Sequence, residues 1–140
     1  KRAARGNAPD GVRNLDRLVV RSVEKAEEAL RAGNYPQVEH SARRALKGFP
    51  RHRYGRFFLS VSLLSQGRLE ESIRENERLL SDHPDFDEGW LQLANAYETV
   101  GDPDGALIAY NRLVQKAIDP ALRSLAKERR ERLLGKQGGS

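Results

Sequence analysis

A constant 34-residue period is the feature of this sequence that most constrains its fold. Gly33, Gly67 and Gly101 are equally spaced at this period, and Pro50 and Pro84 lie at the same interval. A period of about 20–50 residues is typical of solenoids, in which a unit buries its apolar face only by stacking on its neighbours. The repeat predicts units at 19–52, 53–86 and 87–120.

Within these units the apolar residues recur at helical spacing. Trp90, Leu93, Ala94 and Tyr97 fall at i, i+3, i+4 and i+7, which places them on one face of a helix. No segment alternates apolar and polar residues over the length of a strand. The sequence therefore predicts an all-α fold, with helices at 14–31, 36–47, 53–66, 70–81, 87–100, 103–117 and 120–134.

Local chemistry marks where these helices begin and end. An N-cap is indicated by Asn or Asp followed three residues later by Gln or Glu, or directly by Pro in the first turn. The sequence predicts such caps at Asn34, Asp85, Asp102 and Asp119. The three repeated glycines are expected to end helices in the left-handed conformation, which other residues resist.

The domain limits follow from the repeat and from the two ends of the chain. Residues 1–13 are predicted to be a flexible basic segment, 14–134 the folded domain and 135–140 a disordered tail. The amphipathic segment 120–134 is predicted to cap the third unit, because a terminal unit needs a cover. The alternative is a free basic helix that binds a membrane or a partner.

Charge is distributed unevenly along the chain. Residues 1–60 carry a net charge of +8, residues 61–120 carry −7 and residues 121–140 carry +4. The acidic middle argues against one continuous field for a polyanion. A basic-surface adaptor for nucleic acid or an anionic membrane remains the second hypothesis, and it would use 1–5, 43–56 and 123–132.

The residue patterns of common catalytic and metal sites are missing. There is no cysteine, which excludes thiol nucleophiles, iron–sulfur clusters and Cys-ligated zinc. His40, His52 and His83 are isolated from one another, so we interpret them as turn or surface residues. No phosphate-binding glycine loop or nucleophile elbow occurs. We therefore predict a non-enzymatic protein without a cofactor or a bound metal.

The third unit resembles the tetratricopeptide repeat family. It contains Trp90-x-x-Leu93-Ala94-x-x-Tyr97, followed by an alanine and Tyr110 at the family's spacing. The first unit matches least, because Lys25 stands where the third unit has Leu93. The resemblance implies a right-handed superhelical solenoid of three helix-turn-helix units with a C-terminal capping helix. It also implies that small residues lie where the two helices of a unit approach closely.

The resemblance further implies a protein–protein interaction scaffold or adaptor, similar in kind to co-chaperones. In the family, the first helix of each unit lines a concave groove that holds a peptide or helix of a partner protein. Carried over by the 34-residue register, the groove residues are Val20, Val23, Glu27, Leu30, Tyr54, Phe57, Val61, Leu64, Glu88, Leu91, Asn95 and Glu98.

The composition of this predicted groove favours an apolar partner. Some relatives bind a chaperone's C-terminal carboxylate through Lys, Asn and Arg, but here only Asn95 fits that pattern. The groove suits an amphipathic helix or an extended apolar segment, with basic residues opposite Asp87, Glu88 and Glu98. Alternatively, the N-terminal extension or residues 14–18 fold over the groove and fill it.

Two further predictions concern location and completeness. No apolar run approaches the length of a membrane span and no signal-like segment is visible, which favours a cytoplasmic or cytosol-facing protein. The chain starts at Lys1 rather than Met, so it is also compatible with a helper domain from a larger protein.

Overall fold

Seven helices account for nearly all of the described chain. The computed structural model describes residues 10–138, and within that range it contains no strand. The helices are α1 (Asp10–Arg31), α2 (Tyr35–Gly48), α3 (Arg53–Ser65), α4 (Leu69–Asp82), α5 (Asp87–Val100), α6 (Pro103–Lys116) and α7 (Pro120–Gly138). The all-α prediction and its seven helices are confirmed.

The two end helices are longer than the sequence predicts. The first helix begins at Asp10 rather than at residue 14, and the last runs to Gly138 rather than ending at 134. Basic Lys136 lies in the last turn of α7, where its charge complements the helix dipole. The remaining residues of the two predicted flexible ends lie outside the described residues.

Helix ends follow the predicted chemistry at most boundaries. The Asn34 side chain accepts a hydrogen bond from the Gln37 amide at 3.3 Å, and Asp102 accepts one from the Gly105 amide at 3.0 Å. The three repeated glycines have φ of 72°, 80° and 83°, as expected for left-handed helix ends.

The predicted cap at Asp85 is wrong. The N-cap of α5 is Phe86, which offers no side-chain hydrogen bond and is 4% exposed. Packing therefore decides where this helix begins, because Phe86 must reach the interior. The Asp85 carboxylate instead lies 3.5 Å from the Arg112 guanidinium.

Two of the histidines have structural roles in turns. His52 caps α3, because its Nδ1 atom accepts a hydrogen bond from the Gly55 amide at 3.0 Å. Burial, with smaller contributions from Arg53 and His83, lowers the pKa of His52 and so favours the neutral ring that can accept this bond. His83 contacts the Arg51 carbonyl through Nε2 at 2.7 Å.

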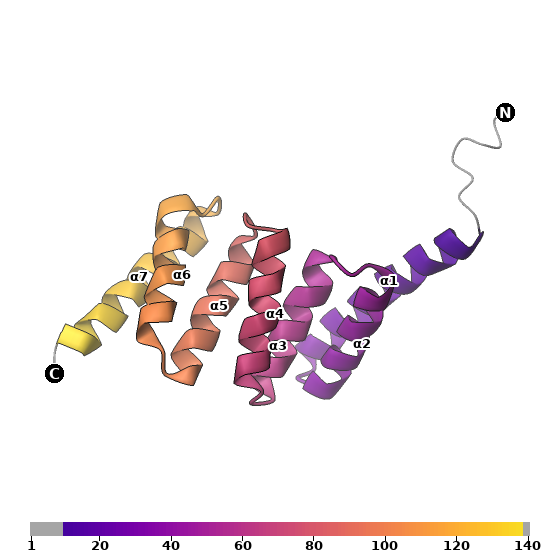
Figure 1. Cartoon of the computed structure of the whole chain (residues 1–140), viewed down its shortest axis with the longest axis horizontal. Helices are drawn as coiled ribbons and strands as arrows, with labels where there is room; N and C mark the ends of the chain where they lie inside the picture. The colour runs from indigo at the N-terminus through magenta and orange to yellow at the C-terminus, as the bar shows by residue number, and fades with distance from the viewer. Residues whose placement is uncertain (1–9, 139–140) are drawn as a thin grey trace.

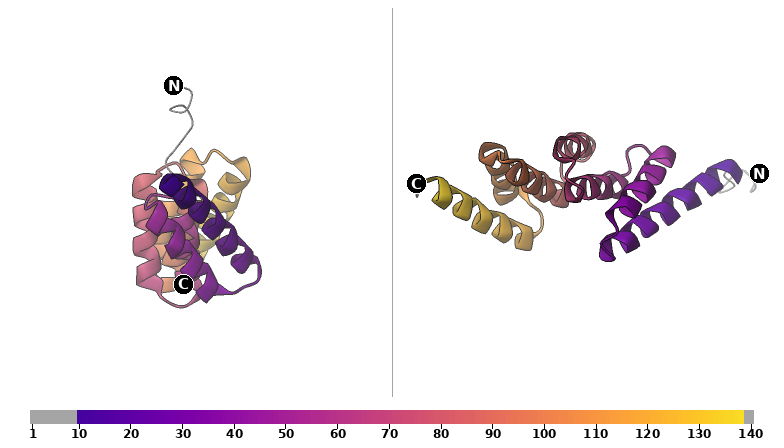
Figure 2. Two further views of the ribbon diagram at one scale, coloured as in Figure 1. Left: turned by 90° about the vertical axis from the view of Figure 1, so that its right-hand side faces the viewer. Right: turned by 90° about the horizontal axis from the view of Figure 1, so that it is seen from below.

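The helices form a solenoid of two rows, and its ends lie far apart (Figure 1). Consecutive helices pack against each other, and α1, α3, α5 and α7 also contact one another in turn. No comparable contact joins α2, α4 and α6 within residues 10–138. The odd-numbered row is thus the more tightly spaced and forms the inner side of the curved molecule seen in Figure 2.

The interior is divided between the two ends of the solenoid. One cluster joins the first and second units and includes Ala26, Leu59 and Leu63, while another surrounds Tyr110 in the third unit. The small residues expected at the helix crossings, Ala26, Ser60 and Ala94, are all fully buried. Trp90 and Tyr97 are only half-buried, and the Trp90 ring N–H donates to the Pro84 carbonyl at 2.8 Å.

The last helix covers the third unit. Ala126 is fully buried in the third-unit cluster, and Leu133 packs against that cluster. Leu134 is 48% exposed and takes no part in this packing. The predicted capping role of residues 120–134 is confirmed, while the alternative of a free helix does not describe this arrangement.

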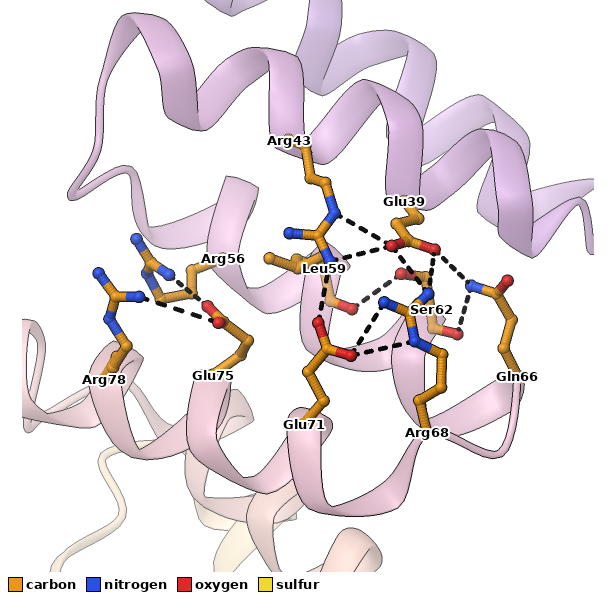
Figure 3. Close-up of polar contacts among 10 residues, drawn as sticks. All are labelled: Glu39, Arg43, Arg56, Leu59, Ser62, Gln66, Arg68, Glu71, Glu75 and Arg78. Atoms are coloured by element: carbon orange, nitrogen blue, oxygen red, sulfur yellow. Dashed lines mark hydrogen bonds and ion pairs between the residues drawn. The ribbon is translucent and has the colours of Figure 1, made fainter.

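A network of charged side chains joins the first unit to the second (Figure 3). Glu39 on α2 accepts hydrogen bonds from Arg43 at 3.0 Å and from Arg68 at 2.9 Å. Glu71 on α4 is bonded by the same two arginines, each at 3.0 Å. Burial raises the pKa of Glu39, but hydrogen bonds from Arg43, Gln66 and Arg68 outweigh it and hold the pKa below its usual value. A hydrogen bond from Arg68 chiefly lowers the pKa of Glu71.

We expect this network to make the protein sensitive to acid. A carboxyl whose pKa is lowered by folding stabilises fully above its unfolded pKa, here about 4.5, and loses that contribution as pH falls through the lower folded pKa. The melting temperature should therefore drop between about pH 5 and about pH 3. The variant Glu39→Gln should show a shallower drop, whereas Glu70→Gln, on an exposed side chain outside the network, should match wild type. Equal acid dependence of Glu39→Gln and wild type would contradict this.

Candidate functional site

The predicted groove residues all lie on α1, α3 and α5, the inner row of helices. Their exposure is mixed, and few of the apolar members are freely exposed. The half-buried residues are Val23, Leu30, Phe57, Val61, Leu64, Leu91 and Asn95. The exposed residues are Val20, Glu27, Tyr54, Glu88 and Glu98.

An aromatic cluster lies beneath the middle of this inner face. Phe86 from the turn before α5 packs edge-on against Tyr54 and Phe57 of α3, with ring centroids 5.5 Å apart in both pairs. The Arg53 guanidinium stacks 5.3 Å from the Phe86 centroid. Phe58 is 6% exposed and belongs to the interior. Phe57 therefore contributes to the packing of α3 against the turn before α5 as well as to the inner face.

The inner face ends in a small cationic cavity between α5 and α7. The cavity has a volume of about 200 Å³. It is lined by Glu98, Leu125, Arg129, Arg132, Leu133 and Lys136. The lining thus contains three cations and only one carboxylate, and its two leucines form an apolar wall.

The one carboxylate in this cavity has a partner of its own. Glu98 accepts a hydrogen bond from the phenol of the buried Tyr110. Burial, together with Glu98, raises the pKa of Tyr110 to about 12, so the phenol stays protonated and able to donate. Beside it, Arg129 donates to the Asn95 side-chain oxygen at 3.0 Å. These contacts fix the orientation of both predicted groove residues.

The charge at this end is opposite to the sequence-based expectation. We expected Asp87, Glu88 and Glu98 to attract basic residues of a partner. Asp87 is 7% exposed, and its carboxylate accepts hydrogen bonds from the backbone amides of Ile118 at 2.8 Å and Asp119 at 3.3 Å. Near Glu98 the three cations of α7 dominate. The surroundings of Glu98 are therefore positively charged, while the Glu88 carboxylate stays exposed.

Sequence reasoning missed the contribution of α7 to the inner face. The patterns within 120–134 predict a cover or a free basic helix, and neither interpretation places its side chains on the inner face. One further step of the 34-residue register would have found them, since Leu125, Arg129 and Arg132 follow Leu91, Asn95 and Glu98 at that interval.

Residues 14–18 do not cover the predicted groove. They belong to α1, and Leu15 and Val19 lie beside Gly48 at the end of α2. A methyl group placed on Gly48 would come within 2.5 Å of Val19 and 3.1 Å of Leu15. Leu15 of this segment thus packs toward α2 rather than across α3 and α5. Residues 1–9, the rest of the proposed cover, lie outside the described residues.

Many side chains of the two basic runs are engaged within the protein. Arg56 is 6% exposed and forms an ion pair with Glu75, and Arg51 lies 3.3 Å from Asp82. In the second run, Arg130 donates to Asn111 at 2.9 Å. The ion pairs reduce the positive charge available for a polyanion along 43–56, whereas the bond from Arg130 to a neutral amide only restrains that side chain.

Two further features concern metal sites and membrane-spanning helices in the described residues. Between residues 10 and 138, no group of three or more His, Cys, Asp or Glu side chains is placed to hold a metal ion. Across the same range, none of the helices combines the length and hydrophobicity that crossing a bilayer requires.

Comparison with known families agrees with the fold. Two profiles described as tetratricopeptide repeat match the chain, one over residues 23–76 and the other over 87–128. The chain belongs to the tetratricopeptide repeat family. Domains of this family are protein–protein interaction scaffolds and are generally non-catalytic. A search of curated proteins finds no match.

Solved structures share the same architecture. The TPR2B domain of yeast Sti1, in its complex with pHsp70, is 17% identical with a TM-score of 0.74, covering 83% of this chain and 92% of that one. The Sgt2 TPR domain from Aspergillus fumigatus is 16% identical with a TM-score of 0.76, covering 87% of this chain and 82% of that one. At these identities the likeness concerns the fold.

Proposed function

We propose that the inner face binds a peptide or helix of a partner protein. The observation that carries this proposal is the row of half-buried apolar side chains that recurs on successive inner helices. The row consists of Val23, Phe57, Val61, Leu64, Leu91 and Leu125. These side chains still expose apolar surface on successive helices. An apolar ligand is favoured there, because its binding removes that apolar surface from water. The Sti1 domain in its complex with pHsp70 is a precedent for partner binding by this fold.

The ligand we propose is apolar along its length and acidic at one end. Its apolar residues lie along α3 and α5, and its acidic residues lie in the cavity where Arg129, Arg132 and Lys136 meet. An amphipathic helix or an extended segment can provide both. The apolar part should tolerate salt, while the acidic end should add a salt-dependent contribution.

Val61→Asp tests this proposal most directly. Val61 is half-buried on the inner side of α3, whereas Phe57 also packs against Phe58 and Phe86, so that its replacement would disturb the fold. Placing a carboxylate on the apolar row should weaken partner capture by about tenfold or more, because the charge would be desolvated on binding. The measurement is affinity capture from native lysate with quantified, identified partners.

Ile108→Asp is the matched control. Ile108 is 69% exposed on α6, in the outer row, and undergoes the same change from an apolar to an acidic side chain. A photo-crosslinking residue at Tyr54, which is 43% exposed, should label the same partner, and one at Ile108 should not. Loss of capture by Ile108→Asp, or full capture by Val61→Asp, would contradict binding at the inner face.

A further inference from the structure

A second cavity lies between α1 and α2, at the N-terminal end of the solenoid. Its volume is about 270 Å³, and no Asp or Glu is among its lining residues. The residues that matter for its chemistry are Arg21, Ser22, Lys25, Gln37, Ser41 and Arg44. None of them belongs to the predicted groove.

The repeat register shows how this cavity differs from its counterpart in the second unit. One repeat later, the positions of Ser22 and Ser41 are occupied by Arg56 and Glu75, a nearly buried ion pair that brings a carboxylate to the equivalent cavity. In the third unit the bulky Trp90 takes the place of Ser22. In the first unit both side chains are short and 2–3% exposed, and neither brings a carboxylate to the cavity.

The second helix of each unit has an arginine at the same repeat position, and its partner differs between the first unit and the later two. Arg78 in the second unit lies 3.9 Å from Glu75, and Arg112 in the third lies 5.3 Å from the Trp90 ring centroid. Arg44 stands at the same position in the first unit but faces two serines instead. Among residues 14–136, no carboxylate forms an ion pair with Arg44, Arg21 or Lys25. None of these three cations is therefore held in an ion pair by the described side chains.

Lys25 is unexpected at its place in the repeat. The equivalent residues Leu59 and Leu93 are buried, at 2% and 7% exposure, and pack between units. A cation here brings no packing, but it adds a third positive charge to the cavity together with Arg21. The Ser41 hydroxyl accepts a hydrogen bond from the Gln37 side-chain amide at 2.8 Å, so its own proton is free to donate. The cavity thus offers cationic and hydroxyl donors.

We infer that this cavity binds a phosphate monoester group. Such a group carries about −1.5 to −2 charges at neutral pH and three acceptor oxygens, which match three cations and two hydroxyls better than a single planar carboxylate does. Two of the cations are arginines, whose guanidinium groups bind phosphate oxygens through paired hydrogen bonds. Free phosphate and a phosphorylated serine side chain of a partner share this chemistry, and the volume of about 270 Å³ admits either.

The test is a titration followed by NMR amide shifts at constant ionic strength. The probes are inorganic phosphate and a short neutral peptide with one phosphoserine, with the same peptide carrying serine or glutamate as comparisons. We expect saturable shifts around Ser22, Gln37 and Ser41. If phosphate alone produces them, the natural ligand is a free anion; tighter binding of the phosphopeptide points to a partner's side chain. The serine and glutamate peptides should bind at least about tenfold more weakly than the phosphoserine peptide.

Arg44→Gln and Lys25→Gln should each weaken binding by about tenfold. Both side chains are exposed, so the fold should persist. Lys47→Gln, the same loss of charge on α2 outside this cavity, should bind as wild type does. Ser22→Arg/Ser41→Glu, which imitates the pair of the second unit, should replace both hydroxyls, place a carboxylate in the cavity and abolish binding.

Several results would overturn the inference. These are shifts that do not saturate, shifts spread over every basic segment, equal binding of the glutamate peptide, equal loss in Lys47→Gln, or preferential binding of an oligonucleotide. The result is independent of the inner-face proposal, since Val61→Asp should leave phosphate binding unchanged.

Discussion

Glu75→Ala should lower the free energy of unfolding by about 3–5 kcal/mol, one of the largest effects we expect for a single charged residue. Glu75 is the ionic partner of Arg56, whose side chain is 7% exposed, and the two are held between the first and second units. Without the carboxylate, Arg56 would keep its hydrogen bond to the Pro50 carbonyl at 2.7 Å but would remain a nearly buried charge without its counter-ion. Urea unfolding followed by circular dichroism measures the change.

Two comparisons make this prediction specific to the buried pair. Glu77→Ala removes an exposed carboxylate from the same helix and should change stability by less than about 0.5 kcal/mol. The double variant Arg56→Met/Glu75→Leu should recover most of the loss, because an apolar pair avoids the cost of desolvating two charges. A cost below about 1 kcal/mol for Glu75→Ala would mean that the pair behaves like a surface ion pair.

Tyr110→Ala should destabilise the third unit by a similar amount, about 3–5 kcal/mol. Tyr110 is fully buried in the cluster that joins α5, α6 and α7, so its truncation leaves a cavity there. Because α7 packs on this cluster, we also expect faster proteolysis at the arginines of α7. Urea unfolding and limited trypsin digestion together measure both effects.

Tyr110→Phe separates packing from hydrogen bonding. The ring is kept and only the hydroxyl that donates to Glu98 is lost. Glu98 is exposed and can bond to water instead, so the cost should be about 1 kcal/mol or less. A loss as large as that of Tyr110→Ala would place the main contribution in the hydroxyl rather than in the ring.

The proposed functions rest on different properties of the same repeat. On the inner face the 34-residue register keeps apolar side chains in line from α1 to α7, and that continuity can hold a segment of a partner. At the N-terminal end the register is broken, because short or charged residues replace the large and apolar residues of the later units. In a repeat protein, residues that recur in every unit can thus form an extended binding surface. Residues that differ in one unit can form a local site.

Local sequence patterns were reliable for the helices and less so for charges. The caps at Asn34 and Asp102 depend on residues three positions apart, which are close in any conformation that starts a helix. Asp85 has the same local pattern, yet α5 begins after Phe86, because a buried aromatic ring contributes more than one exposed cap. Where local and tertiary preferences conflict, only the folded chain shows which is stronger.

The candidate site shows the same division. The placement of Val61 and Leu91 on the inner row followed from the register alone. The charge at the end of that row did not follow from the register. The Asp87 carboxylate accepts hydrogen bonds from backbone amides of the turn before α7, and α7 brings Arg129 and Arg132 beside Glu98. These residues are far apart in the sequence, and no short-range pattern links them.

The repeat, the helices, the helix crossings and the row of residues on the inner helices could all be predicted from the order of residues. These depend on spacing within one helix or on the constant 34-residue interval, and both can be read along the chain. The tertiary structure alone decided which charges are available. Arg56 is neutralised by Glu75, while Arg44 near the N-terminal end of the solenoid meets no counter-ion among residues 14–136. Stacking brings charges from distant units together, so their pairing depends on packing rather than on sequence order.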